Sequence, residues 1–253
     1  MIEVHNLTFG YSATEDGQIL KGVDFAAKTG KLTALIGTNG AGKSTLLKTI
    51  MGILKGKGEI SVNGKPVSQY STKDFSSTVS YLSQDNDCKV NLSVFEVVML
   101  GRMGSMSFRV SDEDIAATQE VLERLNLQRF ASRSIMELSG GQRQLVFMAQ
   151  ALVKEPKILI LDEPTSALDL HKQFDLLTLL KNLTQENDFT TLVTLHHLDL
   201  AAMFADEIIV LKEGRVYAQG APKDIFTEAM MEDVYRVKTK IYIDDNGLPH
   251  VIP

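Results

Sequence analysis

The chain has 253 residues, of which 44% are hydrophobic and 23% are charged, a balance that excludes a disordered or fibrous protein. Because this length is near the upper limit for one hydrophobic core, we expect a single domain with two or three lobes. The net charge of −6 gives no overall field that would attract nucleic acid, and no apolar run reaches the roughly 18 residues that a membrane-spanning helix needs.

The first part of the chain predicts a small β lobe, followed by a strand, a loop and a helix. Residues 2–11 and 18–27 alternate between polar and apolar side chains, which is typical of antiparallel strands with one solvated face. A compact apolar strand follows at 31–37, and residues 43–54 show helical spacing. Residues 58–83 then return to strand-like sequence.

The second part predicts a helical insertion and a buried sheet. Residues 93–135 have helical character, with Ser111 as a candidate N-cap followed three residues later by Asp114. From residue 157 onward, apolar strands alternate with helices, as in a buried parallel sheet. We therefore predict an α/β fold with a mostly parallel core sheet, an antiparallel β lobe and a helical lobe.

The stretch "GTNGAGKST", residues 37–45, has the spacing of a phosphate-binding loop between a strand and a helix. Its glycines would let backbone N–H groups surround phosphate oxygens, and the helix N-terminus would add a partial positive charge. Lys43 would reach the β- and γ-phosphates of ATP, and Ser44 would bind Mg²⁺. A flexible glycine turn is the alternative interpretation. The residues predicted to contact the nucleotide are Asn39, Gly40, Ala41, Gly42, Lys43, Ser44 and Thr45.

Two carboxylates follow the apolar strand "ILIL" in the sequence "ILILDEP". Asp162 and Glu163 would emerge at the carboxyl edge of the sheet, where ligands bind in open α/β folds. Asp162 would hold Mg²⁺ through water, and Glu163 would activate the attacking water, which favours hydrolysis over transfer to an acceptor. Alone, such a pair is more often a turn and a helix cap, but the phosphate loop favours the catalytic interpretation.

A second glycine loop, "LSGGQ" at 138–142, precedes another predicted helix, and Ser139 taken alone could be a plain helix N-cap. Together, "GTNGAGKST", "LSGGQ" and "ILILDEPTSALD" resemble the ATP-binding subunits of ABC transporters over nearly the whole chain. The resemblance implies a P-loop NTPase fold in one domain, 1–253. It divides the chain into a catalytic core with its β lobe at 1–84 and 136–253, a helical lobe at 85–135, and a C-terminal extension at 228–253.

The resemblance also implies that two copies of the chain pack head to tail. Each "LSGGQ" loop would then close over the γ-phosphate of the ATP that the other copy holds. The residues Ser139, Gly140, Gly141 and Gln142 suit this role, because they offer a hydroxyl, close backbone approach and the positive end of a helix dipole. Asp169 would lie in a loop that crosses the dimer interface.

Four further positions take roles from the resemblance. Tyr11 would stack on adenine, with a tyrosine of the β lobe as the alternative. Gln84 would sense Mg²⁺ and the attacking water and link the site to the helical lobe. His196 would contact the γ-phosphate. His197 stands where relatives commonly have Asp, and because a strand points neighbouring side chains to opposite faces, we expect it to be a surface residue.

Weaker features indicate a subgroup. "VVMLGRMGS", "MAQAL", "LHHLDLAAMFAD" and "DDNGLPHVIP" resemble ATPases of importers for iron–siderophore, haem or cobalamin, although Gln150 replaces a common Arg and Ser83 a common Pro. The predicted function is ATP hydrolysis that drives import of a metal chelate through separate membrane permease subunits. These subunits would dock near 85–135, and a substrate-binding protein would be an indirect partner.

The same features predict a location and leave one alternative. The single cysteine, Cys88, cannot form an internal disulfide, which agrees with a reducing cytoplasm, and the chain opens directly into strand-like sequence. We expect a peripheral protein on the cytoplasmic face of the cell membrane. A soluble ABC ATPase of iron–sulfur cluster assembly has the same layout and would instead bind soluble partners.

Overall fold

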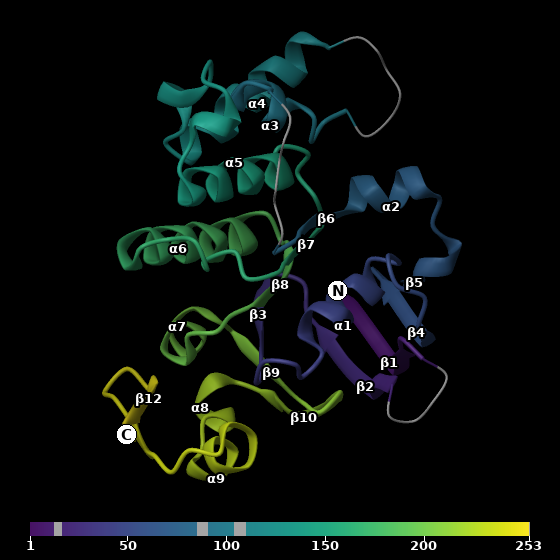
Figure 1. Ribbon diagram of the computed structural model, residues 1–253, viewed down its shortest axis with the longest axis vertical. Coiled ribbons are helices and arrows are strands. Elements are labelled where there is room, and N and C mark those ends of the chain that lie inside the picture. The colour runs from purple at the N-terminus through teal and green to yellow at the C-terminus, as the bar shows by residue number, and fades with distance from the viewer. Residues whose placement is uncertain (13–16, 85–90, 104–109, 253) are drawn as a thin grey trace.

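A computed structural model of the protein describes residues 1–12, 17–84, 91–103 and 110–252, and it shows the predicted α/β architecture (Figure 1). Its centre is a six-stranded sheet in the order β10-β9-β3-β8-β7-β6, in which only the β10–β9 pair is antiparallel. The predicted parallel core is thus confirmed. The strands are β3 (Lys31–Ile36), β6 (Val79–Leu82), β7 (Ile158–Leu161), β8 (Thr190–Thr194), β9 (Glu207–Lys212) and β10 (Arg215–Gly220).

Each central strand separates two hydrophobic cores. In β7, Ile158 and Ile160 face the core around α1, whereas Leu159 and Leu161 face the core around α5 and α6. This is the alternation of side chains expected along a strand. Helix α1 lies on one face of the sheet, and three helices lie on the other (Figure 1). Their bounds are α1 (Lys43–Ile50), α5 (Gly140–Leu152), α6 (Leu170–Glu186) and α7 (Leu198–Phe204).

The predicted β lobe is an antiparallel sheet in the order β2-β1-β4-β5. Leu46, Leu47 and Ile50 of α1 are fully buried in the core between this sheet and the central one. The β lobe therefore fixes the helix that follows the phosphate loop. Its elements are β1 (Ile2–Gly10), β2 (Gln18–Ala27), β4 (Lys57–Val62), β5 (Lys65–Pro66), η2 (Val67–Gln69) and α2 (Thr72–Thr78).

The helical lobe contains the predicted capping box, in which Ser111 and Asp114 exchange hydrogen bonds at the start of α4. Arg102 also binds this carboxylate, with its Nε 2.7 Å from Asp114 Oδ1, and its Nη1 donates to the Val153 carbonyl at 3.1 Å. A side chain at Gly101 would lie 2.3 Å from the Gln150 carbonyl. Gly101 and Arg102 thus join α3, α4 and the end of α5. The elements are α3 (Val94–Met99), α4 (Asp112–Arg124), η3 (Gln128–Phe130) and η4 (Ile135–Glu137).

The C-terminal part packs below the central sheet in the view of Figure 1. It consists of α8 (Pro222–Ile225), α9 (Glu228–Met230), a π-helical turn η5 (Met231–Tyr235) and a hairpin of β11 (Lys240–Ile243) and β12 (Pro249–Ile252). The lobe boundaries inferred from the sequence stay a prediction. Within the described residues, no helix combines the length and the apolar character that crossing a bilayer requires. Cys88 lies outside the described residues.

Candidate nucleotide site

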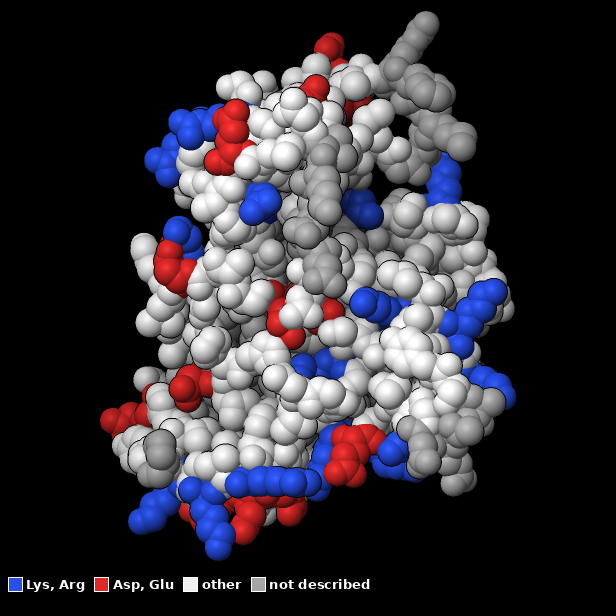
Figure 2. Space-filling view, in the orientation of Figure 1, with Lys and Arg blue, Asp and Glu red and all other residues white. Residues whose placement is uncertain are grey.

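The predicted phosphate loop connects β3 to α1 and borders a pocket of about 530 Å³. Figure 2 shows one face of the molecule, on which acidic and basic side chains are interspersed. Ala41 does not line the pocket, because its side chain is buried in the core around α1. Ile19 of β2 lines it and was not predicted. The lining residues are Ile19, Asn39, Gly40, Gly42, Lys43, Ser44, Thr45, Gln84, Glu163 and His196.

Lys43 is buried at the centre of the loop. Its Nζ donates to the carbonyl oxygens of Gly37 at 2.7 Å and Thr38 at 3.1 Å. Burial lowers the pKa of Lys43, and the nearby carboxylates of Glu163 and Asp162 oppose that shift. The ammonium therefore lies where the loop and the acidic pair meet, which is the position that a phosphate-binding cation needs.

Glu163 brings three predicted residues together. Its Oε2 accepts a hydrogen bond from Gln84 Nε2 at 2.8 Å, and its Oε1 lies 2.5 Å from His196 Nε2. Its backbone has a positive φ of 51°, and its N–H donates to Thr194 Oγ1 at 2.7 Å. A left-handed conformation is uncommon for a residue with a side chain and tends to occur at functional sites. The carboxylate is thus held in place by contacts from two other elements.

Asp162 lies behind this group with an exposed fraction of only 1%. Its Oδ1 accepts a hydrogen bond from Thr194 Oγ1 at 2.9 Å, while Oδ2 is buried without a partner in the described structure. Buried carboxylate oxygens without a partner are rare, because their desolvation is unfavourable. Thr194, which was not predicted, positions both acids. A sequence signal for it exists, since Thr194 ends a strand at the carboxyl edge of the sheet, where ligands bind in open α/β folds.

The residues present fit a Mg²⁺ ion. Mg²⁺ prefers hard oxygen ligands, keeps several waters and uses one or two protein groups together with substrate phosphates. Asp162 Oδ2 and the Ser44 hydroxyl supply such oxygens beside the phosphate loop. Among the described residues, no group of three or more His, Cys, Asp or Glu side chains could form an all-protein metal cage. The donor set therefore suits a nucleotide-bound cation.

The second glycine loop begins α5 and does not line this pocket. Ser139 is the N-cap, as the plain interpretation predicted, and it forms a capping box with Gln142. The Gln142 N–H donates to Ser139 Oγ at 3.3 Å, and the Ser139 N–H donates to Gln142 Oε1 at 3.0 Å. Gly140 is exposed, and a Cβ built on it meets no atom within 4 Å. In one chain, the two glycine loops therefore belong to different surfaces.

Three predicted residues lie away from the pocket lining. Tyr11 is 70% exposed and packs edge-on against Phe9, with ring centroids 5.0 Å apart. Asp169 is the N-cap of α6 and accepts a hydrogen bond from the Lys172 N–H at 3.0 Å. His197 is exposed, as predicted. The reason given for it was wrong, because β8 ends at Thr194 and both histidines lie beyond the strand.

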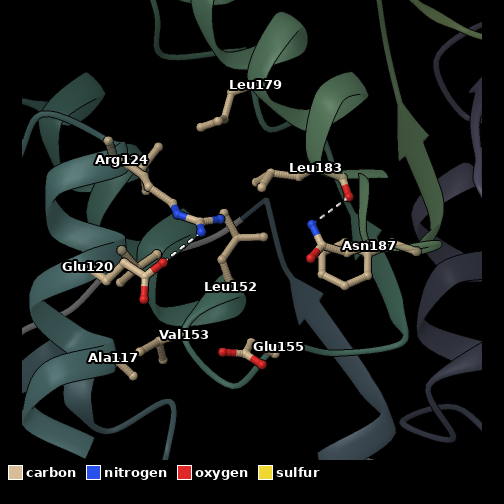
Figure 3. A pocket seen from close by; sticks show the side chains of 12 residues that line it. Ala117, Glu120, Arg124, Leu152, Val153, Glu155, Leu179, Leu183 and Asn187 are labelled. Atoms are coloured by element: carbon tan, nitrogen blue, oxygen red, sulfur yellow. Dashed lines mark hydrogen bonds and ion pairs between the residues drawn. The ribbon is translucent and has the colours of Figure 1, made fainter. Parts of the chain in front are cut away.

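A second pocket lies between α4, α5 and the end of α6 (Figure 3). The ion pair between Arg124 and Glu120 crosses one side of it, and Asn187 donates to the Leu183 carbonyl on the other. None of the predicted nucleotide residues lines this pocket. Its walls are largely aliphatic and lack a glycine loop with backbone N–H groups, so the phosphate-loop pocket is the better nucleotide site.

The comparisons with known proteins agree with this geometry. The family model for ABC transporters matches residues 20–166. The iron(3+)-hydroxamate import ATP-binding protein FhuC of Bacillus subtilis (strain 168) is 37% identical over 246 residues, which cover 96% of this chain and 90% of the relative. The ferric enterobactin transport ATP-binding protein FepC of Escherichia coli (strain K12) is 35% identical over 252 residues, covering 98% and 92%.

Solved structures show the same similarity. One, described as an inward-facing conformation of a metal-chelate type ABC transporter, has a TM-score of 0.84 and 29% identity, with coverage of 100% of this chain and 96% of that one. A dimeric ATP-binding cassette in a post-hydrolysis state, bound to ADP and Pi, has a TM-score of 0.78 and 30% identity, covering 87% and 98%. The chain belongs to the ABC transporter family, as one of its ATP-hydrolysing subunits.

Proposed function

We propose that this subunit hydrolyses Mg-ATP to drive import of an iron–siderophore or related metal chelate through separate membrane permease subunits. The observation that carries the hydrolytic part is the carboxylate of Glu163, which Gln84 and His196 hold at the mouth of the phosphate loop. The names of FhuC and FepC, both iron-chelate transport proteins, support the choice of cargo. The same names favour import over the alternative in iron–sulfur cluster assembly.

Phosphate binding falls to the loop and its lysine. Backbone N–H groups from Asn39 to Thr45 would surround the phosphates, and Lys43 would exchange its two carbonyl partners for phosphate oxygens. Ser44 and Asp162 would hold Mg²⁺, Asp162 through water. When bound, Mg²⁺ would neutralise phosphate charge and favour departure of the β-phosphate oxygen.

Glu163 would accept a proton from the attacking water as it bonds to the γ-phosphorus. Gln84 would position that water and the Mg²⁺ shell. His196 already contacts Glu163 through its Nε2. From this position it would donate a hydrogen bond to the γ-phosphate. The left-handed backbone at Glu163 aims the carboxylate into the pocket, so the base is preorganised before substrate arrives.

A second copy of the chain would complete the site. Ser139, Gly140, Gly141 and Gln142 of one copy would meet the γ-phosphate of the other, and Asp169 would lie at the same interface. The exposed position of Gly140 supports this arrangement, as do the dimeric cassettes among the solved structures. Tyr11 would stack on adenine, for which its exposed ring is available.

The permease would dock on the helical lobe, at the cytoplasmic face of the membrane. Part of the docking region that we predicted near 85–135, namely 85–90 and 104–109, lies outside the described residues. The described part of the lobe exposes Leu100, Met103, Val110 and Ile115 near the junction of α3 and α4. Exposed apolar side chains that cluster on one lobe are typical of a protein–protein contact. A substrate-binding protein would act only through the permease.

The chemical part is tested with Glu163→Gln. We expect this variant to bind Mg-ATP normally and to lose hydrolysis by on the order of 10² or more, because it lacks the base. Glu155→Gln is a matched control, since Glu155 is also a glutamate with a positive φ, of 50°, but does not line the phosphate-loop pocket. Turnover of Glu163→Gln at the rate of Glu155→Gln would move the catalytic role elsewhere, with His196 the first candidate.

The transport part is tested separately by purification of the tagged subunit from membranes. We expect it to bring down a protein with several membrane spans, and mass spectrometry should identify a bound chelate on the assembled transporter. Recovery of soluble partners alone would support the iron–sulfur alternative instead.

A further inference from the structure

Thr194 ends β8 and is fully buried between the strands that carry the nucleotide site. Strand β8 lies between β3, which leads into the phosphate loop, and β7, which leads to the two acids. Thr194 pairs with Leu35 of β3, and the preceding Val193 pairs with Leu161 of β7. Leu192 faces the core around α1, and because side chains alternate along a strand, Thr194 faces the same side. Its hydroxyl therefore lies on the face of the sheet that α1 covers.

The hydroxyl of Thr194 forms one hydrogen bond with each acid, and the directions of both bonds are fixed. The Glu163 N–H can only donate, and it donates to Thr194 Oγ1 at 2.7 Å. The hydroxyl hydrogen is then available to Asp162, whose Oδ1 accepts it at 2.9 Å. A hydroxyl has one hydrogen to donate and lone pairs that accept, so the two bonds use both capacities. One oxygen atom thus links the backbone of Glu163 to the carboxylate of Asp162.

The bond to Oδ1 determines which oxygen of Asp162 is available to a cation. Thr194 occupies Oδ1, whereas Oδ2 is buried and has no partner among the described residues. The rotation of a carboxylate about its Cβ–Cγ bond is only weakly restricted, so a partner on one oxygen is needed to fix the other. Because Mg²⁺ demands near-ideal ligand geometry, this orientation matters for the ion that Asp162 would hold.

The bond from the Glu163 N–H supports an uncommon backbone conformation. Glu163 has a φ of 51°, and such conformations persist where the surrounding structure over-determines them. Gln84 and His196 contact the carboxylate at the end of the side chain. Thr194 holds the same residue at its backbone N–H. The proposed base is therefore fixed at both ends, and Thr194 supplies the contact at the backbone.

We infer that Thr194 is a positioning residue for hydrolysis, which aligns the Mg²⁺ ligand Asp162 and the base Glu163 through one hydroxyl. This inference rests on the nucleotide site proposed above. Thr194 does not line the phosphate-loop pocket, so it acts through the two acids and not on the nucleotide. Loss of the hydroxyl should therefore disturb the Mg²⁺ site and the base together and leave phosphate binding by Lys43 intact.

The test compares Thr194→Val with Thr191→Val. Both variants replace a fully buried hydroxyl of β8 by a methyl group, but the Thr191 hydroxyl is paired with Thr184 Oγ1 of α6 at 2.6 Å. We expect Thr194→Val to lower kcat for ATP hydrolysis by roughly tenfold to a hundredfold, the range for a lost hydrogen bond to a charged group. Thr191→Val should keep the kcat of the unaltered protein. Thr194→Ser retains the hydroxyl and should recover most of the loss.

A second measurement does not depend on turnover. ADP is titrated calorimetrically into each folded variant, once with Mg²⁺ and once with a chelator, and the ratio of the two affinities gives the gain due to Mg²⁺. This gain should shrink several-fold in Thr194→Val, because groups that orient a metal ligand contribute strongly to metal affinity. The affinity for ADP without Mg²⁺ should stay unchanged, since the phosphate loop is untouched. Thr191→Val and Thr194→Ser should keep the gain.

The inference is overturned if Thr194→Val keeps either its kcat or its gain from Mg²⁺, if Thr191→Val loses as much, or if Thr194→Ser is impaired equally. If Thr194→Val is not folded by circular dichroism, Thr194→Ala removes the same hydroxyl and takes its place. If the unaltered protein neither hydrolyses ATP nor binds ADP more tightly with Mg²⁺, the proposed nucleotide site is wrong and the inference falls with it.

Discussion

The two glycine loops of this chain differ in how completely their own chain determines them. The phosphate loop is enclosed by its own chain: a Cβ built on Gly37 would lie 2.2 Å from the Leu211 carbonyl, and the Gly37 carbonyl accepts a hydrogen bond from Lys43 Nζ. In the second loop, the capping box pairs the backbone N–H groups of Ser139 and Gln142 with each other's side chains. Gly140 is exposed, and a Cβ built on it would meet no atom within 4 Å. The first loop is shaped by its own subunit, whereas the second has a surface that only another molecule can cover.

The strongest test of this contrast uses mixed dimers. One subunit carries Lys43→Ala, which removes the phosphate-binding cation, and the other carries Ser139→Arg, which puts bulk and charge at the second loop. If the second loop serves the neighbour, this dimer keeps one intact site and one doubly damaged site. In the mirror pair, unaltered chain with a chain carrying both changes, no intact site remains.

The measurement is ATP-dependent closure, followed by cross-linking across the interface in a Glu163→Gln background. We expect closure in the first mixture and none in the second. The reverse pattern, closure only in the second, would place the second loop in its own subunit's site.

The next largest effect is the loss of stability expected when a side chain is added at Gly37 in the phosphate loop. Gly37→Ala should lower the free energy of unfolding by about 3 kcal/mol or more, because its Cβ would collide with the Leu211 carbonyl in a strained backbone conformation. Gly40→Ala is the control, since it also has a positive φ, of 80°, but open space around its Cβ. Its expected cost is about 1 kcal/mol. Equal costs in urea unfolding would show that packing behind the loop is unimportant.

Smaller changes in stability, of opposite sign, are expected when either glycine of the second loop is replaced by alanine. Gly140→Ala should raise the stability of the subunit by about 0.5–1 kcal/mol, because alanine favours a helix and meets no atom. Gly141→Ala should lower it by about 1–2 kcal/mol, because its Cβ would lie 2.9 Å from the Ala167 carbonyl.

Despite its gain in stability, Gly140→Ala should weaken ATP-dependent closure in the Glu163→Gln background, since the added methyl would lie in the dimer contact that we propose. Unchanged closure would remove Gly140 from the dimer contact.

The smallest effect concerns the stability of the helical lobe at acid pH. Hydrogen bonds from Arg102 and Ser111 lower the pKa of Asp114 to about 2 from its ordinary 3.8. A depressed carboxyl pKa contributes stability that is complete above the ordinary value and is lost as the pH falls toward the folded value. At pH 6, Asp114→Asn should therefore have a lower melting temperature than the unaltered protein. This difference should vanish as the pH approaches about 2.

Glu113→Gln controls for loss of a nearby charge, because Glu113 is 85% exposed and lies 3.5 Å from Arg102. A gap that persists at low pH would mean that Asn disrupts the helix cap for steric reasons.

Local patterns made much of this molecule predictable. The phosphate loop and the acidic pair each occupy a few consecutive residues, so their spacing alone placed them beside strands β3 and β7. The capping box at Ser111 is local for the same reason. The parallel sheet followed from apolar strands that alternate with helices.

Contacts between segments far apart in the chain could not be predicted from local sequence patterns. The hydrogen bond between Tyr217 and Asp233 joins β10 to a π-turn, and no periodicity in the sequence marks that turn. Arg102 joins three helices through one side chain, which no spacing rule reveals. The end of β8 was placed too late, because Leu195 continues the apolar run beyond the hydrogen-bonded ladder.

The junction at Arg102 gives the helical lobe mechanical leverage. Helix α5 has 13 residues, so the carbonyl that Arg102 holds and the glycines at the opposite end are separated by about 20 Å. A tilt of about 10° around the Arg102 end would sweep Ser139 through roughly 3 Å, which is the length of a hydrogen bond. A small rotation of α5 about the end that the Arg102 guanidinium holds is therefore sufficient to make or break a contact at Ser139.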